Sequence, residues 1–93
     1  MSDLANYVRE QCAVSPEFRA VYEEETTLLA LIRARNAADL SQKDVAEALH
    51  VSQPYIAQVE RGSRPMSLSL MVRYANAVGA SIQVVSNHPQ ASP

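Results

Sequence analysis

The 93-residue sequence is poor in the residues that build cross-links, metal sites and phosphate-binding loops. Its single cysteine, Cys12, excludes an internal disulfide and fits a reducing, cytoplasmic location. Two widely separated histidines, His50 and His88, predict neither a structural zinc site nor a cofactor. Two glycines exclude a glycine-rich phosphate loop. With no tryptophan and one phenylalanine, an aromatic platform for single-stranded nucleic acid is disfavoured.

Long apolar runs and catalytic constellations are also missing. No run approaches the roughly 20 residues that cross a bilayer, and the polar start Met1–Asp3 is unlike a signal peptide. We therefore expect no membrane partner. The adjacent glutamates at 23–25 point about 100° apart on a helix, and no other residues form a catalytic pair or triad. The sequence thus predicts a protein that is not an enzyme.

Charge is distributed unevenly along the chain. Residues 1–30 hold two basic and six acidic side chains, a balance of −4. Residues 31–93 hold six basic and four acidic ones, a balance of +2, which together give the net charge of −2. This asymmetry predicts two faces with different partners.

Apolar spacing and helix-start signals predict an almost wholly helical chain. Four serines suit the N-cap position before a helix: Ser15, Ser41, Ser52 and Ser67. Asp44 lies three residues after Ser41 in a capping-box pattern, and Gly79 suits a helix stop. The predicted helices span residues 3–12, 16–37, 42–49, 53–61 and 68–78. The side chains that we expect the last helix to bury are Leu68, Met71, Ala75 and Val78, with Tyr74 alongside.

Residues 42–59 are the most informative segment, because two short helices are joined by about three residues. So tight a connection makes the helices cross steeply and requires a small residue, Ala46, at the crossing. The positions that such a crossing buries are Val45, Leu49, Val51, Ile56 and Val59. This is the helix-turn-helix pattern, whose second helix can enter a DNA major groove about 12 Å wide. The polar face that this helix retains consists of Ser52, Gln53, Tyr55, Gln58 and Arg61.

Particular stretches of residues 28–79 resemble the Cro/C1-type (XRE) helix-turn-helix family. These stretches are Ala30–Arg35, Asp39–Gln42, Val45-Ala46, Val51–Gln53, Ile56 and Val59–Gly62. The flanks, residues 16–24 and 73–80, resemble those of HigA-type antitoxins from bacterial toxin–antitoxin pairs. The resemblance implies a five-helix, lambda repressor-like domain and a homodimer that binds a palindromic operator and represses its own operon. It also implies neutralisation of a RelE-like (HigB-type) ribonuclease toxin.

The resemblance also implies roles for individual residues. With Tyr55 added from the exposed face, the base-reading positions are Ser52, Gln53, Pro54, Tyr55 and Gln58. The family's phosphate-contacting glutamine falls on Gln42, and we expect phosphate contacts from Lys43, Arg61 and Arg64, which lie at a helix start or in the turn after a helix. Arg35 and Glu60 match the family's structural ion pair. Asp39 and His50 stand where the family usually has a left-handed glycine, at an expected cost of about 1 kcal/mol each.

The C-terminal segment predicts a dimer contact. Residues 81–85 are rich in β-branched side chains and predict a short strand, for which the chain offers no obvious partner edge. A chain this short has a thin core, and it has no disulfide or metal. We therefore expect a homodimer through this strand or, as the alternative, through Met71, Val72 and Tyr74. The expected organisation is an acidic helical arm (1–27), a helix-turn-helix domain (28–79), a strand segment (80–86) and a disordered tail (87–93).

The acidic arm is expected to bind a basic protein rather than DNA. Three consecutive glutamates require either solvent or a basic partner, and a ribonuclease needs a basic surface to hold RNA. The residues that we expect to contact this toxin are Tyr7, Glu23, Glu24 and Glu25. One alternative is that helix 3–12 merely packs on Phe18, Val21 and Tyr22 of its own subunit or of its dimer mate. Two functional alternatives are a stand-alone or phage-derived regulator without a toxin, and a toxin-binding module with little affinity for DNA.

Overall fold

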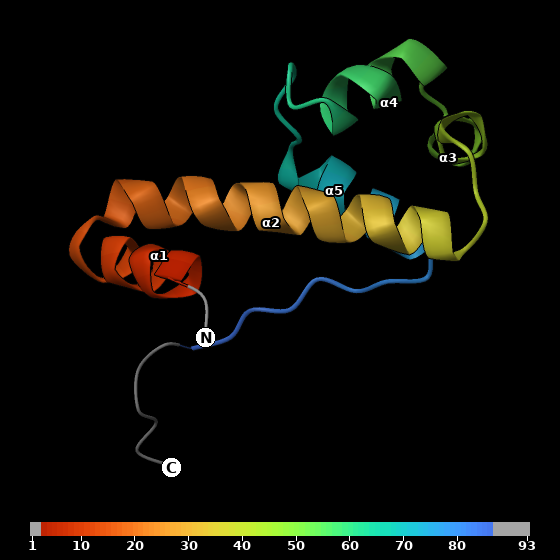
Figure 1. The fold of residues 1–93 in the computed structure, drawn as a ribbon. Helices are drawn as coiled ribbons and strands as arrows, with labels where there is room; N and C mark the ends of the chain where they lie inside the picture. The colour runs from red at the N-terminus through yellow and green to blue at the C-terminus, as the bar shows by residue number, and fades with distance from the viewer. Residues whose placement is uncertain (1–2, 87–93) are drawn as a thin grey trace.

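The computed structural model describes residues 3–86, which form five helices joined by short turns (Figure 1). The helices are α1 (Asp3–Val14), α2 (Pro16–Ala37), α3 (Gln42–Leu49), α4 (Gln53–Glu60) and α5 (Leu68–Ala77). The five predicted helices are thereby confirmed, and α1 continues beyond residue 12 to the residue before Ser15. The expected five-helix domain and its N-terminal helical extension together make up these five helices. Residues 28–79 contain only the second half of α2 together with α3, α4 and α5.

Serine side chains start four of the helices, as predicted. Each hydroxyl oxygen accepts a hydrogen bond of 3.0–3.2 Å from the backbone N–H three residues later: Ser15 from Phe18, Ser41 from Asp44, Ser52 from Tyr55 and Ser67 from Leu70. At the start of α3 the Asp44 carboxylate accepts a 2.8 Å bond from the Ser41 N–H, which completes the capping box. These bonds with Ser41 lower the pKa of Asp44.

Left-handed residues end two of the helices at positions where a glycine would be unstrained. Asp39 after α2 and His50 after α3 both have φ of +60°. The turn at His50 lets the Val51 N–H bond back to the Ala46 carbonyl at 3.0 Å. A residue with a Cβ is uncommon in this region, so both positions carry the strain that the sequence predicted.

The core lies between the second half of α2 and helices α3, α4 and α5. Its buried side chains are Leu31, Val45, Ala46, Leu49, Ile56, Val59, Leu70, Tyr74, Ala75 and Val78. The predicted buried positions of α3 and α4 are confirmed, and Val51 is half-buried against them. On α5 the prediction was wrong for Leu68, which is 71% exposed, because Leu70 and Tyr74 set the inward phase of that helix. Burial of Tyr74 also removes its side chain from the alternative dimer contact.

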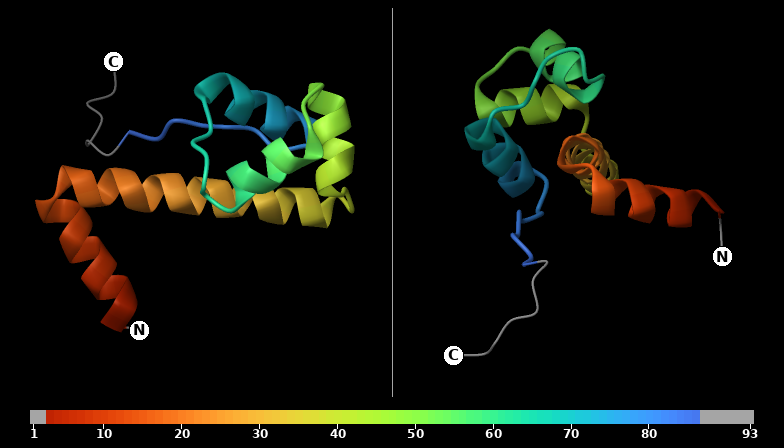
Figure 2. Two further views of the ribbon diagram at one scale, coloured as in Figure 1. Left: turned by 90° about the horizontal axis from the view of Figure 1, so that it is seen from above. Right: turned by 90° about the vertical axis from the view of Figure 1, so that its left-hand side faces the viewer.

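Helix α1 contacts the first half of α2 near the turn that joins them and then projects away from it, on the side away from α3, α4 and α5 (Figure 2). The Tyr7 ring meets the Phe18 ring edge-on, with centroids 6.4 Å apart. This contact agrees with the alternative in which the arm packs on α2 of its own subunit, although Tyr7 stays 53% exposed. None of the α1 residues whose burial the structure describes, 3–11 and 13, belongs to the core described above.

The predicted C-terminal strand is not supported. Residues 81–86 have no regular secondary structure, and no strand occurs anywhere in residues 3–86. A strand needs a neighbouring edge for its backbone hydrogen bonds, and a single chain without other strands supplies none. The segment instead runs beside α2, where Ala80 to Gln83 line a shallow cleft with Thr26, Thr27 and Ala30 (Figure 1). The disordered tail predicted at 87–93 lies outside the described residues.

Candidate nucleic-acid interface

Helices α3 and α4 form a compact helix-turn-helix unit on the core. Ala46 is 2% exposed and Ile56 is fully buried, so the two helices cross closely through small and apolar side chains. The turn between them uses the left-handed His50 and then the cap Ser52, which accepts from the Tyr55 N–H. The chain therefore enters α4 with a fixed direction, and the first turn of that helix exposes Ser52, Gln53 and Pro54.

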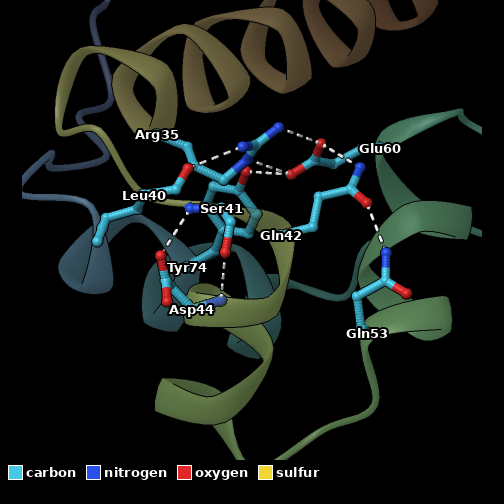
Figure 3. Close-up of polar contacts among 8 residues, drawn as sticks. All are labelled: Arg35, Leu40, Ser41, Gln42, Asp44, Gln53, Glu60 and Tyr74. Carbon is cyan, nitrogen blue, oxygen red and sulfur yellow. Dashed lines mark hydrogen bonds and ion pairs between the residues drawn. The ribbon is translucent and has the colours of Figure 1, made fainter.

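An ion pair fixes α4 to α2. The Arg35 guanidinium donates through Nε to Glu60 Oε2 at 2.8 Å and through Nη2 to Oε1 at 2.9 Å (Figure 3). A third bond, from Nη1 to the Leu40 carbonyl at 2.9 Å, ties the guanidinium to the turn before α3. The side chains of Arg35 and Glu60 are 12% and 6% exposed. This planar, two-pronged pairing matches the ion pair that the sequence predicted at these positions.

Tyr74 contacts this ion pair from the core, and the contacts among the three side chains shift their pKa values. Its hydroxyl donates to Glu60 Oε2 at 2.5 Å, and burial, followed by this hydrogen bond, raises the pKa of Tyr74 well above its ordinary value. Burial alone would raise the pKa of Glu60, but hydrogen bonds from Arg35, Tyr74 and Gln42 outweigh it and lower that pKa. The bond to Glu60 raises the pKa of Arg35. Glu60 therefore stays ionised and Tyr74 neutral.

Two glutamine amides extend the network to the protein surface. Gln42 Nε2 donates to Glu60 Oε1 at 3.0 Å, and Gln53 Nε2 donates to Gln42 Oε1 at 2.7 Å (Figure 3). An ionised carboxylate can only accept hydrogen bonds, so the Gln42 amide must turn its nitrogen, and not its oxygen, toward Glu60. Gln42 consequently offers its oxygen to Gln53, whose own carbonyl oxygen has no donor within residues 3–86. The carboxylate thus determines the orientation of an exposed amide on α4.

This series of contacts was not predicted from the sequence. The predicted roles of Gln42 and Gln53 were separate DNA contacts, and the predicted role of Glu60 was only that of partner to Arg35. A signal was present, because each glutamine directly follows a capping serine, in Ser41-Gln42 and Ser52-Gln53. The two side chains therefore occupy the same position at the starts of two crossing helices.

The remaining predicted DNA contacts lie around the ends of α3 and α4. Lys43 is exposed in the first turn of α3, Arg61 is exposed immediately after α4, and Gln58 is half-buried. The Arg64 guanidinium lies over the Tyr55 ring, 5.1 Å from its centroid, a contact that neither residue's predicted role included. Arg73, for which we predicted no role, donates to the Leu49 carbonyl at 2.7 Å at the end of α3.

The residues predicted to bind a toxin do not form one cluster. Glu23 pairs with Arg19 on the surface of α2, with 3.7 Å between nitrogen and oxygen. Glu24 and Glu25 instead line a groove between α2 and the loop that follows α4. Tyr7 is on α1, against Phe18.

None of the helices in residues 3–86 is long and apolar enough to span a membrane. Within the same residues, no three His, Cys, Asp or Glu side chains gather in a way that could hold a metal ion.

Comparison with known proteins identifies relatives for most of the chain. A helix-turn-helix family model matches residues 31–85. Antitoxin HigA1 of Mycobacterium tuberculosis, in strains CDC 1551 and H37Rv, is 37% identical over 91 residues, which cover 94% of this chain and 61% of that protein. An uncharacterised HTH-type transcriptional regulator of the same organism is 39% identical over 51 residues, 55% of this chain and 36% of the relative. The chain thus spans less than two thirds of these relatives' length. No solved structure matches it significantly.

Proposed function

Because the chain belongs to the helix-turn-helix family whose model matches residues 31–85, we propose that it is a sequence-specific DNA-binding repressor. The observation that carries this proposal is the hydrogen-bond chain from Glu60 through Gln42 to Gln53. These hydrogen bonds position the amide of Gln53 at the exposed start of α4, the helix that would enter the major groove. An amide held in one orientation selects between bases better than a freely rotating one.

The fixed amide of Gln53 suits an adenine. Adenine presents an acceptor, N7, and a donor, N6–H, side by side in the major groove. One amide hydrogen of Gln53 is bonded to Gln42, which leaves its second hydrogen for N7 and its oxygen for N6–H. Ser52, Pro54, Tyr55 and Gln58 would complete the base-reading surface. Pro54 has no side-chain donor, so its contact can only be apolar, for example with a thymine methyl.

Contacts with the DNA phosphates would hold this base-reading surface in register with the duplex. Lys43 and the N-terminus of α3 supply positive charge on one side, and Arg61 and Arg64 supply it on the other. The second amide hydrogen of Gln42 is free for a phosphate oxygen, because the first is bonded to Glu60. A single α4 makes few base contacts, so we propose a homodimer that reads a palindrome with half-sites about 34 Å apart.

The relatives extend the proposal to a toxin–antitoxin pair. The match to antitoxin HigA1 covers 94% of the chain, whereas the helix-turn-helix model begins only at residue 31. The similarity therefore includes the acidic N-terminal arm, residues 1–27 in the proposed division of the chain. We propose that the chain neutralises a basic, RelE-like ribonuclease through this arm and represses the operon that encodes both proteins.

A stand-alone regulator without a toxin is the second candidate. It is favoured by the match to an uncharacterised transcriptional regulator over 51 residues, which are too few to include the whole chain. A stand-alone regulator would leave the acidic arm without a binding partner.

A two-part experiment tests the proposed function. Fluorescence anisotropy with DNA from the promoter of this gene should show binding that a shuffled duplex of the same length does not compete away, and sedimentation should show a dimer. Co-expression should restore growth to cells that produce the protein from the neighbouring reading frame. Binding without growth rescue would favour the stand-alone regulator. A monomer that binds both duplexes equally would contradict the repressor proposal.

A further inference from the structure

A groove lies between the middle of α2 and the loop that joins α4 to α5. Val21 and Leu28 line it from α2, and Pro65 and Met66 line it from the loop. Its floor includes Leu31 and Val59, which are 3% and 1% exposed, so the floor is the edge of the core itself. The groove shares no lining residue with the Gln42 and Gln53 surface.

Two carboxylates and one cation, Arg64, lie among the apolar side chains of this groove. Glu24 and Glu25 follow Val21 by three and four residues, so all three project from one face of α2. Neither carboxylate has an ion pair or hydrogen bond with any other described residue, whereas the carboxylate of the adjacent Glu23 is paired with Arg19. The cation that lines the groove within residues 3–86, Arg64, is engaged over the Tyr55 ring.

We propose that this groove binds a basic segment of a partner protein, in which a lysine or arginine lies next to a bulky apolar side chain. The aliphatic stem of such a cation packs on apolar surface while its charged end reaches a carboxylate. DNA is excluded as the occupant of the groove, because its phosphates carry the same negative charge as Glu24 and Glu25. A second copy of this chain would bring its own acidic arm toward the same carboxylates. This inference rests on the proposed function in one respect, since it identifies the partner with the basic ribonuclease.

The groove can be probed without the ribonuclease. The probe is a synthetic peptide of alternating lysine and leucine, with a lysine–serine peptide of equal charge as its control, titrated into the full chain while amide chemical shifts are recorded. We expect shifts at residues 21–28 and 62–71 with the leucine peptide. The double variant Glu24→Gln/Glu25→Gln should weaken binding about ten-fold. The matched variant Glu10→Gln/Glu17→Gln removes the same charge from exposed positions outside the groove and should leave the affinity nearly unchanged.

Several outcomes would overturn the proposal. Equal weakening by the two double variants, or equal binding of the two peptides, would mean that the acidic arm attracts cations without a specific site. Groove shifts that depend on protein concentration alone would assign the groove to a second copy. Peptide-induced shifts of residues 87–93 together with the groove would assign it to the chain's own end.

Growth rescue separates this inference from the proposed function. If the Glu24→Gln/Glu25→Gln variant neutralises the neighbouring protein as well as the parent chain does, the groove proposal fails and the antitoxin proposal stands. If the parent chain neutralises nothing but the peptide still binds the groove, the antitoxin proposal fails and the groove remains a site for basic segments.

Discussion

At the scale of single residues, the Glu60 carboxylate connects stability with recognition. It accepts hydrogen bonds from Arg35, Tyr74 and Gln42, and so links α2, α5 and the start of α3 to the end of α4. Its side chain is only 6% exposed, so little water is available to replace a lost partner. A change at this residue should therefore affect both folding and the orientation of Gln53.

We expect Glu60→Gln to lower the free energy of unfolding by about 3 kcal/mol, because it leaves the largely buried Arg35 charge without a counter-ion. Thermal denaturation followed by circular dichroism measures this loss. Glu47→Gln, which removes an exposed carboxylate from α3, is the control and should change stability by less than about 0.5 kcal/mol. An unchanged melting temperature for Glu60→Gln would show that the ion pair does not stabilise the fold.

Acid should weaken the fold through the same carboxylate. The pKa of Glu60 is lower in the folded chain than its ordinary value of 4.5, so the folded state binds the proton less readily than the unfolded state. The resulting stability is fully present above about pH 4.5 and is lost as the pH falls through the lower, folded pKa. The difference in unfolding free energy between the parent chain and Glu60→Gln should therefore shrink below pH 4.5. A difference that stays constant as the pH is lowered from 4.5 until the chain unfolds would refute this assignment.

His50→Gly should stabilise the chain by about 0.5–1 kcal/mol, because glycine adopts φ of +60° without a Cβ clash. Asp39→Gly should act in the same direction. The reciprocal control is Gly79→Ala, where φ is +79° and an added Cβ would meet no atom within 4 Å, so only backbone strain should destabilise it. Urea denaturation at neutral pH measures all three variants. Destabilisation by His50→Gly would indicate that the imidazole makes a contact that outweighs the strain.

At the scale of elements, we propose that α4 makes the base contacts, whereas the start of α3 and the turn after α4 make the phosphate contacts. We expect Gln53→Ala to cost about 1–3 kcal/mol on the preferred operator and to relax selectivity at one base pair. Lys43→Ala should weaken binding to all duplexes alike and should reduce the slope of log affinity against log salt concentration by about one. Anisotropy titrations on single-base operator variants at several salt concentrations separate the two effects. An equal loss of selectivity in both variants would mean that this division of roles is wrong.

The helices could be predicted from the sequence because their signals are local. A serine at 15, 41, 52 or 67 bonds to a backbone N–H three residues later whatever lies around it. The strand at 81–85 could not be judged in this way, because a strand depends on an edge supplied from elsewhere. The inward phase of α5 was also not local, since it is set by the bond of Tyr74 to Glu60, fourteen residues earlier. The link between Gln42 and Gln53 likewise depends on the crossing of α3 and α4.

At the scale of the whole molecule, helix α1 of the proposed arm lies apart from the core (Figure 2). Helix α1 packs on the first half of α2, whereas the core uses Leu31 from the second half. The 22 residues of α2 form the continuous connection between the two parts. We therefore propose that the arm can lose its partner-binding role without unfolding the domain.

A chain that begins at Ser15 tests this separation. It keeps the cap of α2 and the whole core, so its melting temperature should fall by only a few degrees and its operator affinity should be unchanged. It should no longer restore growth when co-expressed with the protein from the neighbouring reading frame. Double replacement of Tyr7 and Leu4 by serine in the full chain is the matched variant, since both side chains are more than half exposed. Unfolding of the shortened chain would show instead that α1 is a structural part of the domain.

The contact between Gln42 and Gln53 also limits how this protein can evolve a new operator. A residue that replaces Gln53 must donate to the Gln42 oxygen, because Glu60 fixes the orientation of that amide. Glutamate at position 53 would face that oxygen with another acceptor and lose the support that orients it. Specificity can drift more freely at Tyr55 and Gln58, whose side chains have no bond to this chain of amides. The preference for one base pair should therefore be inherited with the core, while the neighbouring preferences diverge among relatives.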